Sequence, residues 1–348
     1  MKPFKKAVLH VGPPKSGSTA IQSTFNRNRD FLYNNGVYYP SGVSHPLLGS
    51  YFSNLPEYYS YNFGQSSNVE EIKLRDSCYM KHLRSELEEK SGALLVLSYE
   101  GFVTLDIEAL ELLKMFMSEY ADHCEVVFYA RAPLSFATSA MSQCVKMGYL
   151  AWADSSRLIT PFIDYLDNIN FVFDKGRLIV RKYCKSTFPD GNILRDFFFT
   201  IGFPASLCNI DALFRNTDSN MSLSYEAMLV GENIINKLSN QISRIDFVKL
   251  YTPVISRIEG NKIRLSGDQA SEILSKSSAH SKYLQTKYNI SFNEDYNMLI
   301  GENSVDETVI KSNIDELADN IINLVQPTII YPLTFANDIS DTSKSCCM

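Results

Sequence analysis

Residues 7–22 read Ala-Val-Leu-His-Val-Gly-Pro-Pro-Lys-Ser-Gly-Ser-Thr-Ala-Ile-Gln, and they are the clearest indication of the fold of this chain. An apolar run of strand length, 7–11, meets a turn broken by glycine and proline. Ser18 and Thr19 then open a segment that reads as a helix to about Asn28. This order points backbone N–H groups and the positive end of the helix dipole at one place, and glycine lets the backbone approach closely. The stretch therefore predicts a phosphate-binding loop, and the alternative is an ordinary strand-to-helix corner.

The position of the lysine indicates which phosphate this loop binds. A loop for ATP or GTP reads G-x-x-x-x-G-K-[ST], with a hydroxyl that holds Mg²⁺ after the lysine. Here Ser18 stands at the lysine position, and the lysine lies upstream at Lys15. The run 14–19, Pro-Lys-Ser-Gly-Ser-Thr, resembles the 5′-phosphosulfate loop of sulfotransferases that use 3′-phosphoadenosine 5′-phosphosulfate (PAPS). By this resemblance the donor is bound by Lys15, Ser16, Gly17, Ser18 and Thr19.

The composition is typical of a soluble globular protein. The 348 residues are 45% hydrophobic and 21% charged, and they contain no run of 18 apolar residues. The net charge of −6 argues against a general nucleic-acid or anionic-membrane binder, although a local basic pocket for a nucleotide can persist. The seven cysteines are scattered, without metal-site spacing or a disulfide framework. We expect a cytoplasmic protein with no membrane span and no nucleic-acid partner.

Expected strands and helices alternate throughout residues 6–202. Apolar runs at 93–98 and 125–130 are typical of strands buried on both faces of a parallel sheet. Two further strands are expected at 36–40 and 177–183, and helices at 69–90, 107–120, 133–146, 149–172 and 193–201. The order predicts an α/β fold of the P-loop type in three layers, a central parallel sheet flanked by helices, with ligands at the carboxyl ends of the strands.

Beyond residue 203 the pattern changes to helices alone. These are expected at 222–240, 267–286 and 305–325. We interpret them as a helical C-terminal extension of the same unit. The expected organisation is a single domain over 1–330, with its core at 6–202, the extension at 203–330 and a tail at 331–348.

A second motif lies at the end of the strand expected at 125–130. Arg131 follows this strand, and Ser139 comes eight residues later, two turns into the next helix. The pair resembles the segment of PAPS sulfotransferases that binds the 3′-phosphate, for which the planar guanidinium of arginine is suited. The alternatives are a salt bridge for Arg131 and a bond back to a helix carbonyl for Ser139. The spacing, in the right order after the Lys15 loop, favours phosphate binding.

The resemblance covers residues 6 to about 202 well and the remainder only vaguely. The runs 171–183 and 196–202 also look like this family, and by that match Tyr183 lies near the adenine. The loop is most similar to that of bacterial carbohydrate sulfotransferases, which reads like His-x-Gly-Pro-x-Lys-x-Gly-Ser-Thr-x-Ile-Gln. Ala20 stands where small-molecule members carry tryptophan, which disfavours a phenol or steroid acceptor.

An aromatic stretch at 41–68 is the candidate acceptor site. Its rings alternate with Ser, Asn, Gly and Gln, and they are Tyr51, Phe52, Tyr58, Tyr59, Tyr61 and Phe63. Ring faces that stack beside amides and hydroxyls suit a sugar or polyol. The alternative is a tyrosine-rich loop that packs on its own domain.

Three residues are candidates for the chemistry. By the resemblance, Lys15 stabilises the charge that grows on the leaving 5′-phosphate. Glu100 stands at the carboxyl end of the strand at 93–98, shielded by its aromatic neighbours, and is our candidate general base. The alternative for Glu100 is a surface acid near a helix start. His45, in the aromatic stretch, is the reserve candidate, although a lone loop histidine is more often structural.

These features predict a sulfotransferase that moves a sulfuryl group in line from PAPS to a hydroxyl of a carbohydrate-type acceptor. No metal is implied, because the family relies on lysine, serine and backbone donors. A nucleoside-phosphate kinase is the enzymatic alternative, but Ser18 at the lysine position and the lack of a clear Mg²⁺-binding acid speak against it. A non-catalytic nucleotide-binding protein is the alternative outside enzymes.

Overall fold

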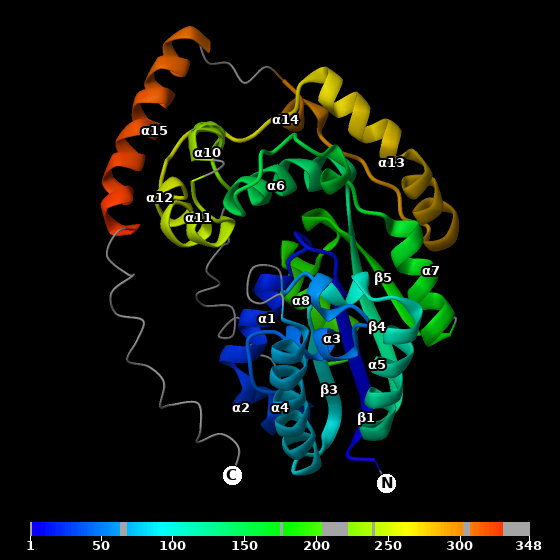
Figure 1. The fold of residues 1–348 in the computed structure, drawn as a ribbon. Coiled ribbons are helices and arrows are strands. Elements are labelled where there is room, and N and C mark those ends of the chain that lie inside the picture. Colours follow the sequence, from blue (N-terminus) through cyan, green and yellow to red (C-terminus); the bar gives the residue numbers. More distant parts are fainter. Residues whose placement is uncertain are drawn as a thin grey trace, which may run out of the picture. The chain divides into compact units, whose positions relative to one another are not determined.

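The structure is a computed structural model, and it describes residues 2–62, 68–174, 177–203, 222–238, 241–301 and 307–329 (Figure 1). By its internal contacts the chain divides into two compact units. The first comprises Met1–Ala137, Ser156–Met221 and Ala270–Asp295, and the second Thr138–Ser155, Ser222–Gln269 and Tyr296–Met348. The expectation of a single domain over 1–330 stays a prediction.

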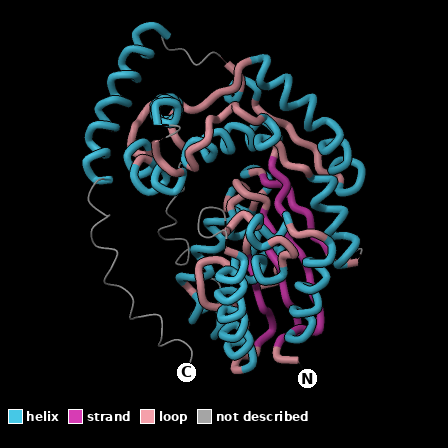
Figure 2. Tube along the Cα trace, in the orientation of Figure 1, coloured by secondary structure: helices cyan, strands magenta, loops and turns pink. Residues whose placement is uncertain are grey.

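A five-stranded parallel sheet forms the centre of the first unit (Figure 2). Its spatial order is β2-β3-β1-β4-β5, and all neighbouring strands pair in parallel. The strands are β1 Phe4–Gly12, β2 Val37–Tyr38, β3 Gly92–Ser98, β4 Ala121–Arg131 and β5 Leu178–Tyr183. Because the strands are parallel, the residues at their carboxyl ends meet at one edge of the sheet.

Helices connect the strands and follow them. In the order of the chain, the helices up to residue 200 are α1 Ser18–Arg27, α2 Arg29–Asn34, α3 Pro46–Phe52, α4 Val69–Glu88, α5 Ile107–Tyr120, α6 Pro133–Lys146, α7 Phe162–Phe173 and α8 Ile193–Thr200. Short 3₁₀ turns lie at η1 Pro56–Tyr58, η2 Glu100–Thr104, η3 Ser155–Leu158, η4 Lys185–Thr187 and η5 Pro189–Gly191. The later helices are α10 Tyr225–Leu238, α11 Arg244–Leu250, α12 Thr252–Ile255, α13 Gly267–Tyr288, α14 Tyr296–Leu299 and α15 Glu307–Ile329.

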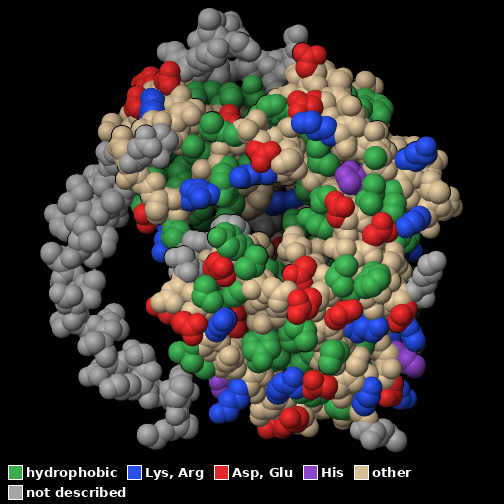
Figure 3. All heavy atoms as spheres, turned by 45° about the vertical axis from the view of Figure 1, so that its right-hand side comes forward, with side chains coloured by type: hydrophobic (Ala, Val, Ile, Leu, Met, Phe, Trp, Pro, Cys, Tyr) green, Lys and Arg blue, Asp and Glu red, His purple; other side chains and the backbone are tan. Residues whose placement is uncertain are grey.

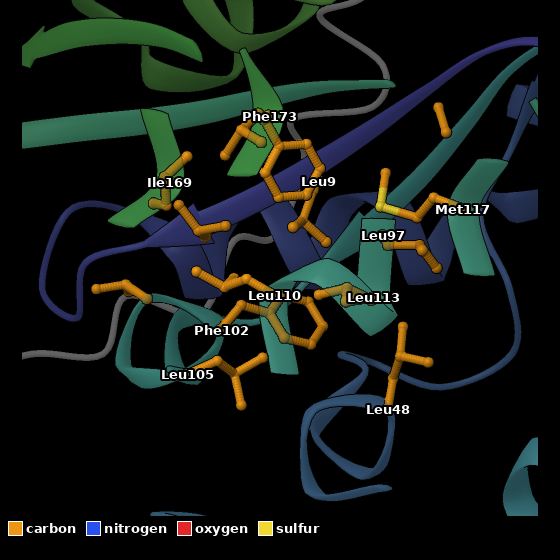
Figure 4. Close-up of a cluster of buried hydrophobic side chains, with 14 of the residues drawn as sticks. Leu9, Leu48, Leu97, Phe102, Leu105, Leu110, Leu113, Met117, Ile169 and Phe173 are labelled. Carbon is orange, nitrogen blue, oxygen red and sulfur yellow. The ribbon is translucent and has the colours of Figure 1, made fainter. Parts of the chain in front are cut away.

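The sheet has a separate hydrophobic core on each face. Leu9, Leu97 and Phe128 point to one face, where side chains of α3, α4, α5 and α7 cover them. Figure 4 shows Leu9 and Leu97 among labelled side chains of α3, α5 and α7. Val8, Val96 and Val127 point to the other face, which α1, α2 and α8 cover. Successive side chains of a strand alternate between faces, so a strand buried on both sides is apolar throughout. This is why the continuous apolar runs predicted the strands of the sheet correctly.

The α/β fold class with a parallel sheet flanked by helices is therefore confirmed. The expectation of one helix over 149–172 is wrong, because the helix α7 begins only at Phe162. Pro161 is the N-cap of α7, and a proline ring does not fit inside a helix without clashing with the preceding turn. The aromatic stretch at 41–68 contains the helix α3, which begins at Pro46.

Residues 270–295 belong to the first unit, where the part of α13 from residue 270 onward packs on α7. Tyr283 donates a hydrogen bond to Asp167, and the Lys287 ammonium donates one of 2.9 Å to the same carboxylate. Leu284 and Ile290 complete the core on that face. The helix expected at 267–286 is confirmed, with α13 at Gly267–Tyr288.

The second unit is helical in its described residues. The helices expected at 222–240 and 305–325 are present as α10 and α15, joined by an ion pair of 2.6 Å between Lys237 and Asp319. The short helices α11 and α12 were not expected. Ser243 caps α11 by accepting from the N–H of Asp246, and Thr252 donates to the Lys146 carbonyl at the start of α12.

The surface carries charges of both signs. On the face drawn in Figure 3, acidic and basic side chains are interspersed with hydrophobic ones. No helix in the described ranges combines the length and the apolarity that a membrane crossing needs.

Candidate functional site

The candidate site lies at the carboxyl ends of four neighbouring strands of the first unit. The strand β1 ends at Gly12 before the predicted phosphate loop, and β3 ends at Ser98 before Glu100. The strands β4 and β5 end together, since Arg131 and Tyr183 are partners in register. The fold thus gathers residues that lie up to 171 positions apart in the sequence at one edge of the sheet, counting from Gly12 to Tyr183.

The loop between β1 and α1 has a backbone that favours glycine at one position. Gly17 is the N-cap of α1 with φ +85°, in the left-handed region, and it has no side chain with which to cap the helix. A Cβ there would lie 3.1 Å from both Tyr183 and Ile193, closer than side chains normally pack. The first N–H groups of α1 are therefore left to an outside acceptor, and an anion is a suitable one.

The hydroxyls of the loop differ in their roles. Ser16 is fully buried and donates a 2.5 Å hydrogen bond to the Pro13 carbonyl, which fixes the turn. Ser18 is 3% exposed, and its Oγ has no hydrogen-bond partner among the residues that the structure describes. A buried hydroxyl without a partner costs free energy, and a bound phosphate oxygen would satisfy it. Thr19 is exposed, and Lys15 is half-buried with φ +66°.

Arg131 connects the loop to the end of β4. Its Nε donates to Ser135 Oγ over 2.9 Å, and its Nη1 donates to the Lys15 carbonyl over 2.5 Å. The guanidinium carbon lies 5.4 Å from the centre of the Tyr183 ring. Burial lowers the pKa of Arg131, but a guanidinium remains charged in proteins. The structure thus brings Lys15, Arg131 and Tyr183 together, and their roles toward a donor stay predictions.

Ser139 is not joined to this group by any described contact. It is half-buried on α6, in the part of that helix that belongs to the second unit. Its predicted role toward the 3′-phosphate stays a prediction.

Glu294 is a site residue that the sequence did not indicate. Its carboxylate accepts hydrogen bonds from the N–H groups of Leu134 and Ser135, at 3.0 and 2.7 Å, and so caps the N-terminus of α6 beside Arg131. Burial raises the pKa of Glu294, although these N–H groups and the charge of Arg131 act against the rise. Glu294 lies 160 residues from Leu134, so no local pattern pointed to it.

Glu100 stands where β3 turns into η2, and it is half-buried. One carboxylate oxygen, Oε2, accepts a 3.0 Å hydrogen bond from Gln22 Nε2. The Glu100 backbone lies directly against the end of β1, since a Cβ at Gly12 would come within 2.8 Å of the Glu100 Cβ. Gly12 also has φ +90°, which side-chain-bearing residues rarely adopt. The candidate base therefore lies against Gly12, where β1 meets the phosphate loop.

His45 lies in the interior instead of on an open surface. It is fully buried at the start of α3, its Nδ1 accepts from the N–H of Ser98 over 3.0 Å, and its ring packs 4.7 Å from that of Tyr39. Burial lowers the pKa of His45 from 6.5 to about 4, so the imidazole is neutral at physiological pH. These contacts are typical of a structural histidine.

The aromatic stretch divides into core and surface residues. Phe52 and Tyr59 are part of the hydrophobic core, at 8% and 4% exposure. Tyr51 and Tyr58 are exposed, at 44% and 67%. The prediction for Phe63 lies outside the described residues. Tyr61 is half-buried, and the Arg75 guanidinium lies over its ring. Among the described rings of this stretch, Tyr51 and Tyr58 are thus the most accessible to a ligand.

Taken together, these residues can bind an anion with N–H groups, a hydroxyl and a guanidinium while a carboxylate stands beside the same loop. Within the described residues, no group of three or more His, Cys, Asp or Glu side chains is arranged to hold a metal ion.

No known protein-family model matches the chain. An uncharacterized protein of Archaeoglobus fulgidus is 26% identical to it over 148 residues, which are 42% of this chain and 39% of that protein. The match therefore spans about two fifths of that relative's length.

Two solved structures are similar in part. The crystal structure of a sulfotransferase from Alicyclobacillus acidocaldarius has a TM-score of 0.40 and 11% identity, over 84% of this chain and 97% of that one. The sulfotransferase domain from the curacin biosynthetic pathway has a TM-score of 0.31 and 15% identity, over 79% and 98%. Likenesses this distant carry no weight for function, which has to be inferred from the residues of the site.

Proposed function

We propose that the protein is a sulfotransferase that moves a sulfuryl group from PAPS to a hydroxyl of a carbohydrate-type acceptor. The observation that carries the proposal is the hydrogen bond from Arg131 to the Lys15 carbonyl, which joins the two predicted phosphate-binding elements in one site. Arg131 Nη2 makes no hydrogen bond with a described residue, so part of the fork remains for a phosphate. The donor supplies the activated sulfuryl group, and the residues bind, orient and deprotonate.

The loop holds the 5′ end of the donor in this proposal. The N–H groups that follow Gly17 and the unpartnered Ser18 Oγ bind the 5′-phosphate, with Ser16 shaping the turn and Thr19 at its exposed rim. Lys15 places its ammonium against the oxygen that leaves with that phosphate, where negative charge grows during transfer. Arg131 and Ser139 bind the 3′-phosphate, and Tyr183 lies on the adenine side.

Glu100 is the general base. It takes the proton of the acceptor hydroxyl while the oxygen forms its bond to sulfur and the bond from sulfur to the 5′-phosphate oxygen breaks. The products are a sulfate monoester, 3′-phosphoadenosine 5′-phosphate and one proton, held first on the Glu100 carboxyl. We prefer Glu100 to His45, because His45 is fully buried and bonded to the Ser98 backbone.

The acceptor is a sugar hydroxyl in this proposal. The exposed rings of Tyr51 and Tyr58 suit stacking on a sugar face. We place the reaction in the cytoplasm, as the sequence predicts, and without a metal ion.

Calorimetry and a transfer assay test the proposal. We expect 3′-phosphoadenosine 5′-phosphate to bind 10- to 100-fold more tightly than ADP without Mg²⁺, since each charge-assisted hydrogen bond to the 3′-phosphate contributes roughly 1.5–3 kcal/mol. With ³⁵S-labelled PAPS, oligosaccharides that contain hexosamine, galactose or uronic acid should acquire label. Equal affinities, or binding that requires Mg²⁺, would favour the kinase alternative. Tight binding of the bisphosphate without any transfer would indicate a non-catalytic nucleotide-binding protein.

A further inference from the structure

Gln22 joins the helix that begins at the phosphate loop to the candidate base. It lies in the second turn of α1 and is 6% exposed. Its side-chain nitrogen donates two hydrogen bonds, one of 3.0 Å to Glu100 Oε2 and one of 3.2 Å to Ser98 Oγ. An amide nitrogen carries two hydrogens, so both bonds can be made at once.

The surroundings fix the orientation of this amide. If it were turned over, its oxygen would face the Glu100 carboxylate, and two acceptors would repel each other. Ser98 Oγ is itself held by a 2.8 Å hydrogen bond with His10 Nδ1, across the β1–β3 pair. His10 is fully buried, and burial lowers its pKa to about 3, so this chain of contacts brings no further charge to Glu100. Gln22 is thereby a rigid donor aimed at one oxygen.

Gln22 binds one of the two carboxylate oxygens of Glu100. Oε2 accepts from Gln22, whereas Oε1 accepts no hydrogen bond from any described residue. Gly12 lets the Glu100 backbone lie against the end of β1, because Gly12 has no Cβ to meet Glu100. One carboxylate oxygen is therefore anchored, and the other is left to receive a proton.

We propose that Gln22 is a positioning residue for the reaction, which fixes Glu100 Oε2 so that Oε1 faces the acceptor hydroxyl. This rests on the proposed function of the site. Because Gln22 and the anion-binding N-terminus belong to the same helix, α1 sets the position of the base relative to the sulfuryl donor. A general base works only within hydrogen-bond reach of its proton, so a loose carboxylate would lower the rate without weakening donor binding.

The first test is Gln22→Met, which keeps the side-chain length and removes the donor. The assay uses PAPS and the oligosaccharide that accepts the sulfuryl group fastest, or water as acceptor if no oligosaccharide is sulfated. We expect kcat to fall about 10- to 100-fold, while the Kd for 3′-phosphoadenosine 5′-phosphate stays within about twofold. Thr24→Val is the matched control, because Thr24 is a buried residue of the same helix with no described side-chain bond. It should keep kcat and should not lower the stability, because valine has the shape of threonine and removes a buried hydroxyl that has no described partner.

A double-mutant cycle separates positioning from a structural role. If Gln22 acts through Glu100, then Gln22→Met should lower kcat no further in a Glu100→Gln background, whereas independent effects would multiply. Multiplying losses, an unchanged kcat for Gln22→Met, or equal losses of affinity and kcat would each overturn the proposal.

If the Gln22→Met variant does not fold, Gln22→Glu provides an alternative test. A second carboxylate about 3 Å from Glu100 would hinder its ionisation, so the acidic limb of the kcat/KM profile should move to higher pH. The tyrosines around Glu100, Tyr39, Tyr59 and Tyr99, have pKa values raised by burial and stay neutral in this range. A superimposable profile would refute the role of Gln22. If the wild-type protein neither turned over PAPS nor bound the bisphosphate, the proposed function itself would be refuted.

Discussion

Arg131 donates a 2.5 Å hydrogen bond from its Nη1 to the carbonyl oxygen of Lys15. Lys15 has φ +66°, a left-handed backbone that a side-chain-bearing residue adopts at a cost of roughly 1 kcal/mol. The arginine therefore stabilises the loop conformation from outside the loop. Since the same guanidinium is assigned to the 3′-phosphate, one side chain would bind the 3′ end of the donor and hold the loop that binds its 5′ end.

Arg131→Lys should weaken binding of 3′-phosphoadenosine 5′-phosphate by about one to two decades. A lysine ammonium cannot reach Ser135, Lys15 and a phosphate with the planar fork of arginine, so charge-assisted bonds of roughly 1.5–3 kcal/mol are lost. Calorimetry against ADP measures the change, and the preference for the bisphosphate should shrink. Arg84→Lys is the control, because Arg84 forms an exposed pair with Glu119. Equal effects of both substitutions would contradict a phosphate role for Arg131.

Lys15→Ala should reduce turnover more than donor affinity. The proposed role of the lysine is to stabilise charge that forms during transfer, and Arg131 and Ser16 hold the loop backbone. Lys15→Gly should lose the same activity yet be more stable than the alanine variant by up to roughly 1 kcal/mol, because glycine adopts positive φ readily. Equal losses of binding and turnover would instead make Lys15 a ground-state anchor.

Glu100→Gln should lower the rate by about 10²–10⁴-fold while the bisphosphate binds normally. Glutamine keeps the size of the side chain but cannot accept the proton. The comparison variant is His45→Ala, which should melt at a lower temperature and keep its rate per folded molecule, since His45 is buried against Tyr39. If His45→Ala were inactive and Glu100→Gln active, the base would come from the aromatic stretch.

The sequence predicted the parts of the site whose signals are local. The strand, turn and helix around Gly17 follow from neighbouring residues, and Arg131 could be placed because it ends an apolar run. Tyr183 was assigned through the family resemblance of the run 171–183. Contacts set by tertiary packing carry no such signal. Gln22 and Glu100 are 78 residues apart, so the hydrogen bond between them emerges only from the pairing of β1 with β3.

The same distinction explains the errors in helix boundaries. Residues 149–172 contain enough apolar positions to suggest one helix, but the helix begins only after Pro161. Upstream of it, the Ala151 N–H bonds to the Glu232 carboxylate, a partner 81 residues away that no helical pattern could indicate. The aromatic stretch was ambiguous because Phe52 and Tyr58 belong to one residue class, and only packing decides which is buried.

Acid should destabilise the protein through its two buried histidines. Burial lowers the pKa of His45 to about 4 and that of His10 to about 3, from 6.5 in the unfolded chain. Between the folded-state and unfolded-state pKa values, the unfolded state binds protons that the folded state excludes. The stability that the neutral rings contribute is therefore present above pH 6.5 and is lost as the pH falls toward 4 and 3.

Urea unfolding at several pH values measures the slope of the unfolding free energy against pH. His45→Gln should lower that slope by up to roughly 1.4 kcal/mol per pH unit between pH 6 and 4, because the glutamine does not titrate and only His10 and the carboxylates remain. An unchanged slope in this variant would mean that His45 is protonated in the folded protein, and its reading as a buried neutral side chain would then fail.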